Sequence, residues 1–118
     1  MMADEISRLL ALAESGDWTE RVRAVTDLGE RSEAEARTAV AVALYDADNT
    51  AVTEAAVAGL VRRGDDAARE ALLDALRSDD NETADHVYGF LDCRAGQGSA
   101  FAQSVLDEYL RQRQLKAH

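Results

Sequence analysis

The chain lacks proline, contains one cysteine and has few aromatic residues, which make up 5% of its 118 residues. One cysteine cannot form a disulfide within the chain, so we expect Cys93 to be a free thiol in a reducing compartment, the cytoplasm. The segment Met1–Glu5 lacks the basic and apolar stretches of a signal peptide. No apolar run is long enough to predict a membrane span. The abundance of alanine without proline predicts an all-α fold.

Basic residues are also scarce, with 13 Lys and Arg against 23 Asp and Glu, and the formal net charge is −10. Binding to a phosphate backbone or to anionic lipid requires clustered Lys and Arg, so we expect neither nucleic acid nor membrane as a partner. The acidic excess is concentrated in residues 46–92, which contain 12 acids and 4 bases. Apolar residues make up 47% of the chain, a balance typical of globular proteins.

Leucines recur with a period of about 32 residues. Leu28, Leu60 and Leu91 lie 32 and 31 residues apart, and apolar or small residues precede each by three and four positions. That spacing places each set on one face of a helix. A second series interleaves with the first and consists of Leu12, Leu44 and Leu76. Two helices per period predict a repeated helical hairpin.

The same pattern predicts seven helices joined by turns that contain capping residues. Asp17 and Glu20 match a capping box, and so do Ser32 and Glu35. We expect the longest break at Arg94–Gly98, where two glycines interrupt the period. The expected helices span residues 4–15, 18–30, 33–45, 50–63, 66–78, 82–93 and 99–114.

The segment 48–60, which reads DNTAVTEAAVAGL, resembles the second helix of a HEAT repeat. That family favours Asp in the turn, then Val-Arg, a pair of small residues and Ala-Leu-Gly. In the first copy, Arg21 falls on the family's Arg position and Leu28–Gly29 on its Leu-Gly. Thr53 and Ala84 replace the Arg in the later copies, so the Asp–Arg ladder typical of the family is expected only at Arg21.

The resemblance extends over residues 4–93 and implies a right-handed α-solenoid of about three and a half HEAT-like hairpins. In such a stack, neighbouring hairpins bury a continuous core that one hairpin could not bury alone. We expect a single domain over residues 1–118, with repeats at 4–31, 33–63 and 66–93 and a C-terminal capping helix at 99–114.

The sequence predicts no catalytic, cofactor or metal site. His86 and Cys93 share a face of one expected helix, but their seven-residue spacing corresponds to about 10 Å along the axis. That distance is too long for one zinc ion or for a nucleophile and its base. The serines lie in helices or at caps, outside any nucleophile-elbow motif. We therefore expect a protein that is not an enzyme.

Two surfaces are the candidate binding sites for another protein. In a stack of hairpins, the second helices line the concave face and equivalent turns align along the edges. Carboxylates at helix N-termini stabilise the helix dipole, yet an aligned row of them also attracts a basic partner. The candidate residues on the concave face are Arg23, Thr26, Asp27, Ala58, Arg62, Asp85 and His86. Those on the acidic edge are Asp46, Asp48, Asp79, Asp80 and Glu82.

The opposite turns predict a basic edge, partly offset by Asp65 and Asp66. We expect Trp18, the single tryptophan, to pack against the first helix rather than to form a contact hot spot. The arginines of the expected basic edge are Arg31, Arg62, Arg63 and Arg94.

Together these features favour a non-catalytic protein-interaction module or adaptor, monomeric or weakly dimeric, whose partner is another, possibly basic, protein. The alternative is an immunity- or inhibitor-type protein that neutralises a basic toxin or nuclease, which the net charge of −10 suits. HEAT-like repeats also occur in bilin lyases and base-excision glycosylases. A glycosylase needs a basic groove facing DNA, which the acidic segment 46–92 argues against.

Overall fold

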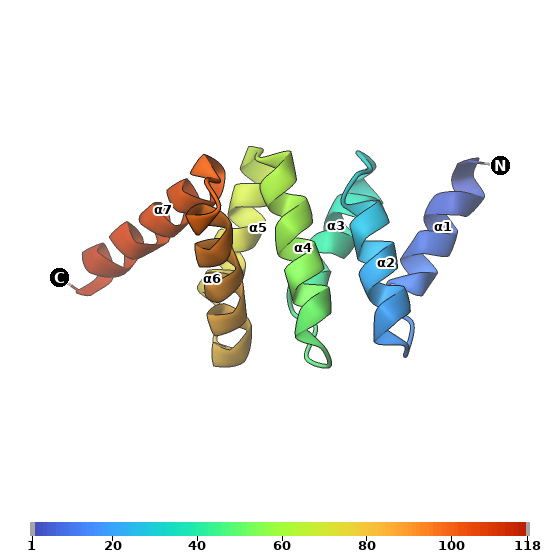
Figure 1. Ribbon diagram of the computed structural model, residues 1–118, viewed down its shortest axis with the longest axis horizontal. Coiled ribbons are helices and arrows are strands. Elements are labelled where there is room, and N and C mark those ends of the chain that lie inside the picture. Colours follow the sequence, from blue (N-terminus) through green and yellow to red (C-terminus); the bar gives the residue numbers. More distant parts are fainter. Residues whose placement is uncertain (1, 118) are drawn as a thin grey trace.

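The computed structural model describes residues 2–117, with side chains from residue 5 to residue 115. The described residues form seven helices and no strand, which confirms the predicted all-α class. The molecule is elongated, with extents of 53 × 26 × 24 Å (Figure 1). The helices are α1 (Met2–Leu12), α2 (Trp18–Leu28), α3 (Ala34–Ala43), α4 (Thr50–Arg63), α5 (Asp66–Leu76), α6 (Asn81–Gly96) and α7 (Ala100–Ala117).

The helices form two layers. Helices α2, α4 and α6 lie side by side in one layer, and α1, α3, α5 and α7 form the other (Figure 1). Each hairpin packs mainly on its neighbours along the chain, as α2 does on α4 and α4 on α6. The fold is therefore the predicted solenoid, whose stability comes from contacts within and between adjacent hairpins.

The leucines that define the period lie in the core between these layers. Leu28, Leu60 and Leu91 are 0%, 4% and 0% exposed. In the second series Leu44 is also buried, whereas Leu12, at the end of α1, is half-buried. Burial of apolar side chains is the main favourable contribution to folding, so these positions determine the repeat.

The expected long break at Arg94–Gly98 is wrong. Helix α6 continues to Gly96, and only residues 97–99 connect it to α7. Arg94 and Ala95 both favour helix, so they extend α6, and Gly98 makes the turn with a φ of 102°. The longest connection is instead residues 44–49, between α3 and α4.

Neither expected capping box forms. The carboxylate of Asp17 caps α2 by accepting a bond from the Thr19 N–H, but Glu20 accepts a bond from the Ser15 hydroxyl at 2.6 Å instead of from Asp17. The cap of α3 is Glu33 rather than Ser32. The Asp17 N–H that a capping box would use donates instead to the Ser15 hydroxyl oxygen at 3.0 Å.

Two glycines allow a paired test of backbone conformation. Gly64 ends α4 with a φ of 60°, whereas Gly89 lies on the exposed face of α6 with open space where a Cβ would lie. We expect Gly64→Ala to lower the free energy of unfolding by about 1 kcal/mol and Gly89→Ala to raise it by about 0.5–1 kcal/mol. Urea unfolding followed by circular dichroism measures both, and equal effects of the two substitutions would contradict this interpretation.

Candidate protein-binding surface

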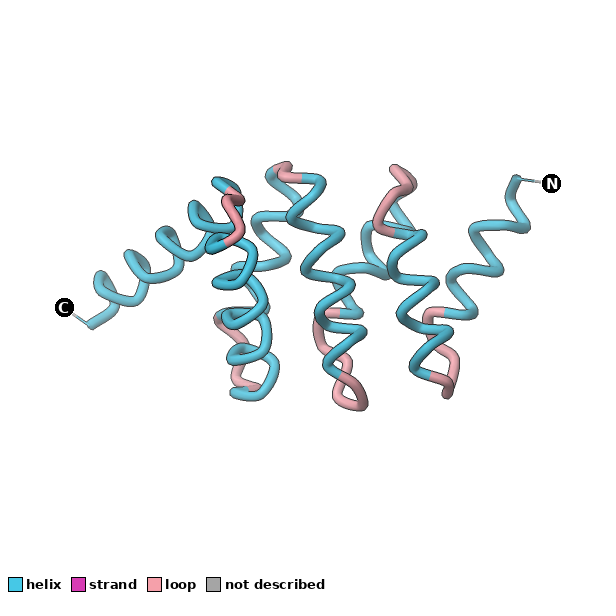
Figure 2. Tube along the Cα trace, viewed as in Figure 1, coloured by secondary structure: helices cyan, strands magenta, loops and turns pink. Residues whose placement is uncertain are grey.

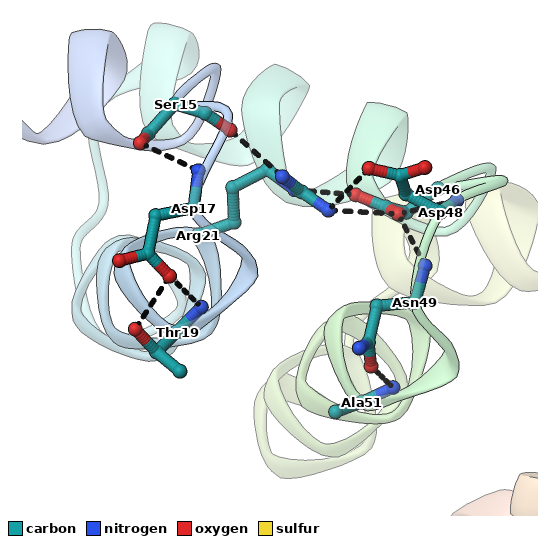
Figure 3. A network of polar contacts seen from close by, with 8 residues as sticks. All are labelled: Ser15, Asp17, Thr19, Arg21, Asp46, Asp48, Asn49 and Ala51. Carbon is teal, nitrogen blue, oxygen red and sulfur yellow. Dashed lines mark hydrogen bonds and ion pairs between the residues drawn. The ribbon is translucent and has the colours of Figure 1, made fainter.

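The turns that join the two helices of each hairpin lie along one edge of the molecule, at the bottom of the view in Figure 2. A buried arginine organises this edge. The Arg21 side chain, 7% exposed, donates from Nε to Asp46 Oδ2 at 2.9 Å and from Nη1 to the Ser15 carbonyl at 2.8 Å (Figure 3). Its Nη2 lies 3.5 Å from Asp48 Oδ2. Arg21 therefore ties the first turn to the second.

Asp46 also holds its own turn in shape. Its Oδ1 accepts bonds from the backbone N–H groups of Asp48 and Asn49, both at 3.0 Å, and Asn49 in turn caps α4 through the Ala51 N–H (Figure 3). The Arg21–Asp46 pair is the Asp–Arg contact expected at this position. In the second hairpin the equivalent residue, Thr53, is buried and carries no charge.

The expected acidic edge contains two kinds of carboxylate. Asp46 is 12% exposed and paired with Arg21, so its charge is largely compensated. Asp48 is 82% exposed, and Asp79, Asp80 and Glu82 are exposed as well. Of the five predicted residues, these four therefore carry the exposed negative charge, and only Asp48 among them approaches Arg21.

A depression of about 70 Å³ lies between the second and third of these turns. Its lining includes Asp48 from the α3–α4 turn. From the N-terminal end of α6 it includes the cap Asp80, Glu82 and His86. The structure thus brings together side chains more than 30 residues apart, which the sequence had only placed at equivalent positions. No lysine or arginine lines the depression among the described residues.

The remaining candidates lie in the layer of α2, α4 and α6, and the structure does not gather them into one patch. Arg23 and Asp27 are exposed on α2, whereas Arg62 is exposed at the far end of α4 from the acidic turns. The Thr26 hydroxyl is occupied, because it donates to the Val22 carbonyl at 2.8 Å. The others on this layer are Ala58 and His86, both partly buried, and Asp85, which is exposed.

The opposite edge is less basic than expected. Arg31 pairs with Glu33 at 2.6 Å, and this hydrogen bond raises the pKa of Arg31. Arg63 donates to the Leu28 and Arg31 carbonyls, where it satisfies the end of α2. Both side chains are therefore engaged within the fold, and Glu33 compensates the charge of Arg31.

The expectation for Trp18 is also wrong. Its side chain is 46% exposed, so it is not a core residue. Trp18 is the first residue of α2 and follows the cap Asp17, so it lies at the acidic edge, before the buried face of the helix begins at Arg21. An exposed tryptophan is a frequent hot spot of protein interfaces, which makes Trp18 a candidate that the sequence pattern missed.

The comparison with known families agrees with this geometry. Residues 6–87 match the family model described as HEAT repeats. This chain belongs to the HEAT-repeat family. The match ends within α6, so α7 of this HEAT array lies outside it. No curated protein matches the chain.

HEAT repeats generally mediate protein–protein interactions and typically serve as non-enzymatic scaffolds. In the part of the HEAT array that the structure describes, no three His, Cys, Asp or Glu side chains gather closely enough to hold a metal ion. Across residues 2–117, no helix has both the length and the apolar character to cross a bilayer.

Carboxylates at the edges of the HEAT array predict a loss of stability in acid. The Arg31 side chain lowers the pKa of Glu33 by hydrogen bonding, and the Ala68 N–H lowers the pKa of Asp65, the cap of α5. A lowered folded-state pKa adds stability above the unfolded-state value, and this stability disappears as the pH falls through the folded-state value. We expect the Tm to be constant above about pH 5 and to fall below about pH 4.

Thermal unfolding followed by circular dichroism over this pH range measures the effect. The matched variant is Asp65→Asn, which can still cap α5 but does not titrate. Its Tm should fall less steeply in acid than that of the wild type. Parallel acid profiles for the two proteins would show that Asp65 contributes nothing to the pH dependence.

Proposed function

We propose that this HEAT array is a non-catalytic adaptor that binds a basic protein through its acidic edge. The observation that supports this most strongly is the clustering of Asp48, Asp80 and Glu82 around one depression that no lysine or arginine lines in the described structure. The net charge of −10 adds a long-range field of the same sign. Such a field accelerates association with a basic partner and selects against acidic ones.

The rigidity of the edge supports the same function. Asp80 accepts bonds from the Glu82 N–H at 3.1 Å and from the Thr83 hydroxyl at 3.0 Å, while Arg21 holds the neighbouring turn through Asp46. Side chains that are ordered before binding lose less entropy when a partner docks. Asp80 therefore both caps α6 and contributes a fixed carboxylate to the binding surface.

The exposed face of the α2–α4–α6 layer extends this surface. We assign it a contact role because it borders the acidic edge at Trp18 and at His86. Aromatic side chains provide large contact areas at interfaces, and a half-exposed tryptophan beside a charged rim fits that role. The other contributors on this face are Arg23, Thr26, Asp27, Ala58, Arg62 and Asp85.

The experiment is affinity purification from the native host with two variants that lose the same charge. One variant carries Asp48→Asn, Asp79→Asn and Glu82→Gln on the acidic edge. The control carries three changes at exposed acids elsewhere, namely Glu70→Gln, Asp92→Asn and Asp107→Asn. We expect wild type and control to retain a basic partner and the edge variant to lose at least about tenfold in affinity at physiological salt. Equal retention by both variants, or recovery of acidic partners alone, would contradict the proposal.

The same surface also suits an inhibitor of a basic toxin or nuclease, because the net charge of −10 complements such a partner. The two functions differ in their effect on the partner. An inhibitor abolishes the partner's activity when it is added in stoichiometric amount, whereas an adaptor leaves that activity in place. An activity assay of the recovered partner distinguishes them.

A further inference from the structure

The layer opposite α2, α4 and α6 contains an open apolar groove between α1 and α3. Its volume is about 770 Å³, and Leu10, Ala39, Val42 and Tyr45 are among its lining residues. Val42 is 65% exposed and Tyr45 is 42% exposed. Large apolar side chains left open to solvent in one groove are typical of a binding site.

The charges at this groove restrict what can occupy it. Glu14 and Glu35 line it and are exposed, and Asp46 lines it with its charge offset by Arg21. The described lining contains no lysine or arginine. An occupant that complements this groove is apolar and carries a positive charge.

The C-terminal part of α7 has these properties. Leu110 is 41% exposed and Leu115 is 71% exposed, and Arg111 between them is exposed and belongs to none of the ion pairs found among the described residues. At about 100° per residue, Leu110, Arg111 and Leu115 span about 140° of the helix circumference, and the buried Leu106 borders this side next to Leu110.

This part of α7 is also accessible. It projects from the end of the molecule, away from α6 (Figure 1). A second groove of about 790 Å³, lined by Ala84 of α6 and Leu115 of α7, separates the two helices there. Although Arg77, the C-cap of α5, donates to Gln112 at 3.0 Å, the side of α7 that carries Leu110, Arg111 and Leu115 is exposed in the described structure.

We propose that the C-terminal part of α7 of one copy docks into the α1–α3 groove of a second copy. Leu110 and Leu115 pack on Val42 and Tyr45, and Arg111 faces the carboxylates of the groove. Helix α1, which lines the groove, and α7 lie at opposite ends of the long axis, so the contact is head-to-tail (Figure 1). A head-to-tail contact leaves one groove and one helix free, and association continues with rising concentration. This proposal does not depend on the acidic edge or on the proposed function.

Sedimentation velocity at physiological salt provides the test, because screening there limits the repulsion between two acidic copies to about 8 Å. We expect the average mass of the wild type to rise between about 10 µM and about 1 mM protein. Val42→Glu and Leu115→Glu each place a carboxylate in the interface at an exposed site, and each variant alone should remain monomeric. Ala100→Glu adds the same charge to α7 outside the interface and should associate like the wild type.

Mixing the two variants decides whether these are the two surfaces of one contact. Val42→Glu retains an intact α7, and Leu115→Glu retains an intact groove, so an equimolar mixture should form a heterodimer that stops at two chains. The double variant should not join either one. Thermal unfolding of each single variant verifies its fold.

Three outcomes would overturn the proposal. The first is a wild type that stays monomeric over the whole range. The second is association that Leu115→Glu removes but Val42→Glu does not, which would indicate pairing of α7 with α7. The third is a monomeric wild type whose groove binds a synthetic Lys/Leu amphipathic peptide that Val42→Glu fails to bind, which would assign the groove to a helix of another protein.

Discussion

Arg21→Ala is expected to lower the free energy of unfolding by about 3 kcal/mol. The substitution removes a side chain that is 7% exposed, together with its bonds to the Asp46 carboxylate and the Ser15 carbonyl. Asp46, itself 12% exposed, then retains only the N–H groups of its own turn. Removing one partner of a buried pair leaves the other charge uncompensated, which is why the loss is large.

Urea unfolding monitored by circular dichroism measures this loss, with Arg23→Ala as the control. Arg23 lies on the same helix and is exposed, so its replacement should change the free energy of unfolding by less than about 0.5 kcal/mol. Arg21→Lys should regain only part of the stability, since an ammonium group cannot reproduce the fork of a guanidinium. If Arg21→Ala and Arg23→Ala lowered the free energy of unfolding by equally small amounts, the Arg21–Asp46 pair would not hold the two turns together.

Leu28→Ala is expected to cost about 3–4 kcal/mol of unfolding free energy. Leu28 is 0% exposed and belongs to α2, which packs on α1, α3 and α4. The smaller side chain leaves a cavity where the first two hairpins meet, and the helices around it are held by the rest of the stack and cannot collapse fully.

The control for this substitution is Leu110→Ala, which removes the same atoms from a side chain that is 41% exposed. It should cost less than about 1 kcal/mol at protein concentrations below those of the proposed association. Denaturant unfolding of both variants at low protein concentration makes the comparison. A similar loss for the two would mean that Leu28 does not occupy the core.

The repeat was readable in the sequence because burial restricts both residue type and position. Leu28, Leu60 and Leu91 all face the interior, and a hairpin about every 32 residues places them at equivalent buried positions. The family resemblance extended this interpretation to an Asp–Arg contact at Arg21, and the structure shows that the partner is Asp46. The helix ends were predicted less accurately. Capping depends on the side chains that approach each turn, as the Ser15 hydroxyl does at Glu20.

Surface charge shows the limit of the same interpretation. Asp46 and Asp48 are two residues apart and look equivalent as acids. Arg21 from the preceding hairpin binds Asp46 at 2.9 Å in a half-buried site, but it lies 3.5 Å from Asp48, which stays 82% exposed. Arg63 likewise looks like a free base, and it is occupied by carbonyls of α2. Each difference depends on a partner about 25 to 35 residues away.

Periodicity, composition and the turn residues therefore establish that this chain is a stack of helical hairpins with an acidic surplus, because these properties depend on neighbours within a few residues. Tertiary structure alone decides which charges are free, why Trp18 is exposed, and where the α1–α3 groove and the unpartnered side of α7 lie. Those features arise from the packing of one hairpin against the next. The sequence of a single hairpin does not determine how closely its neighbour approaches.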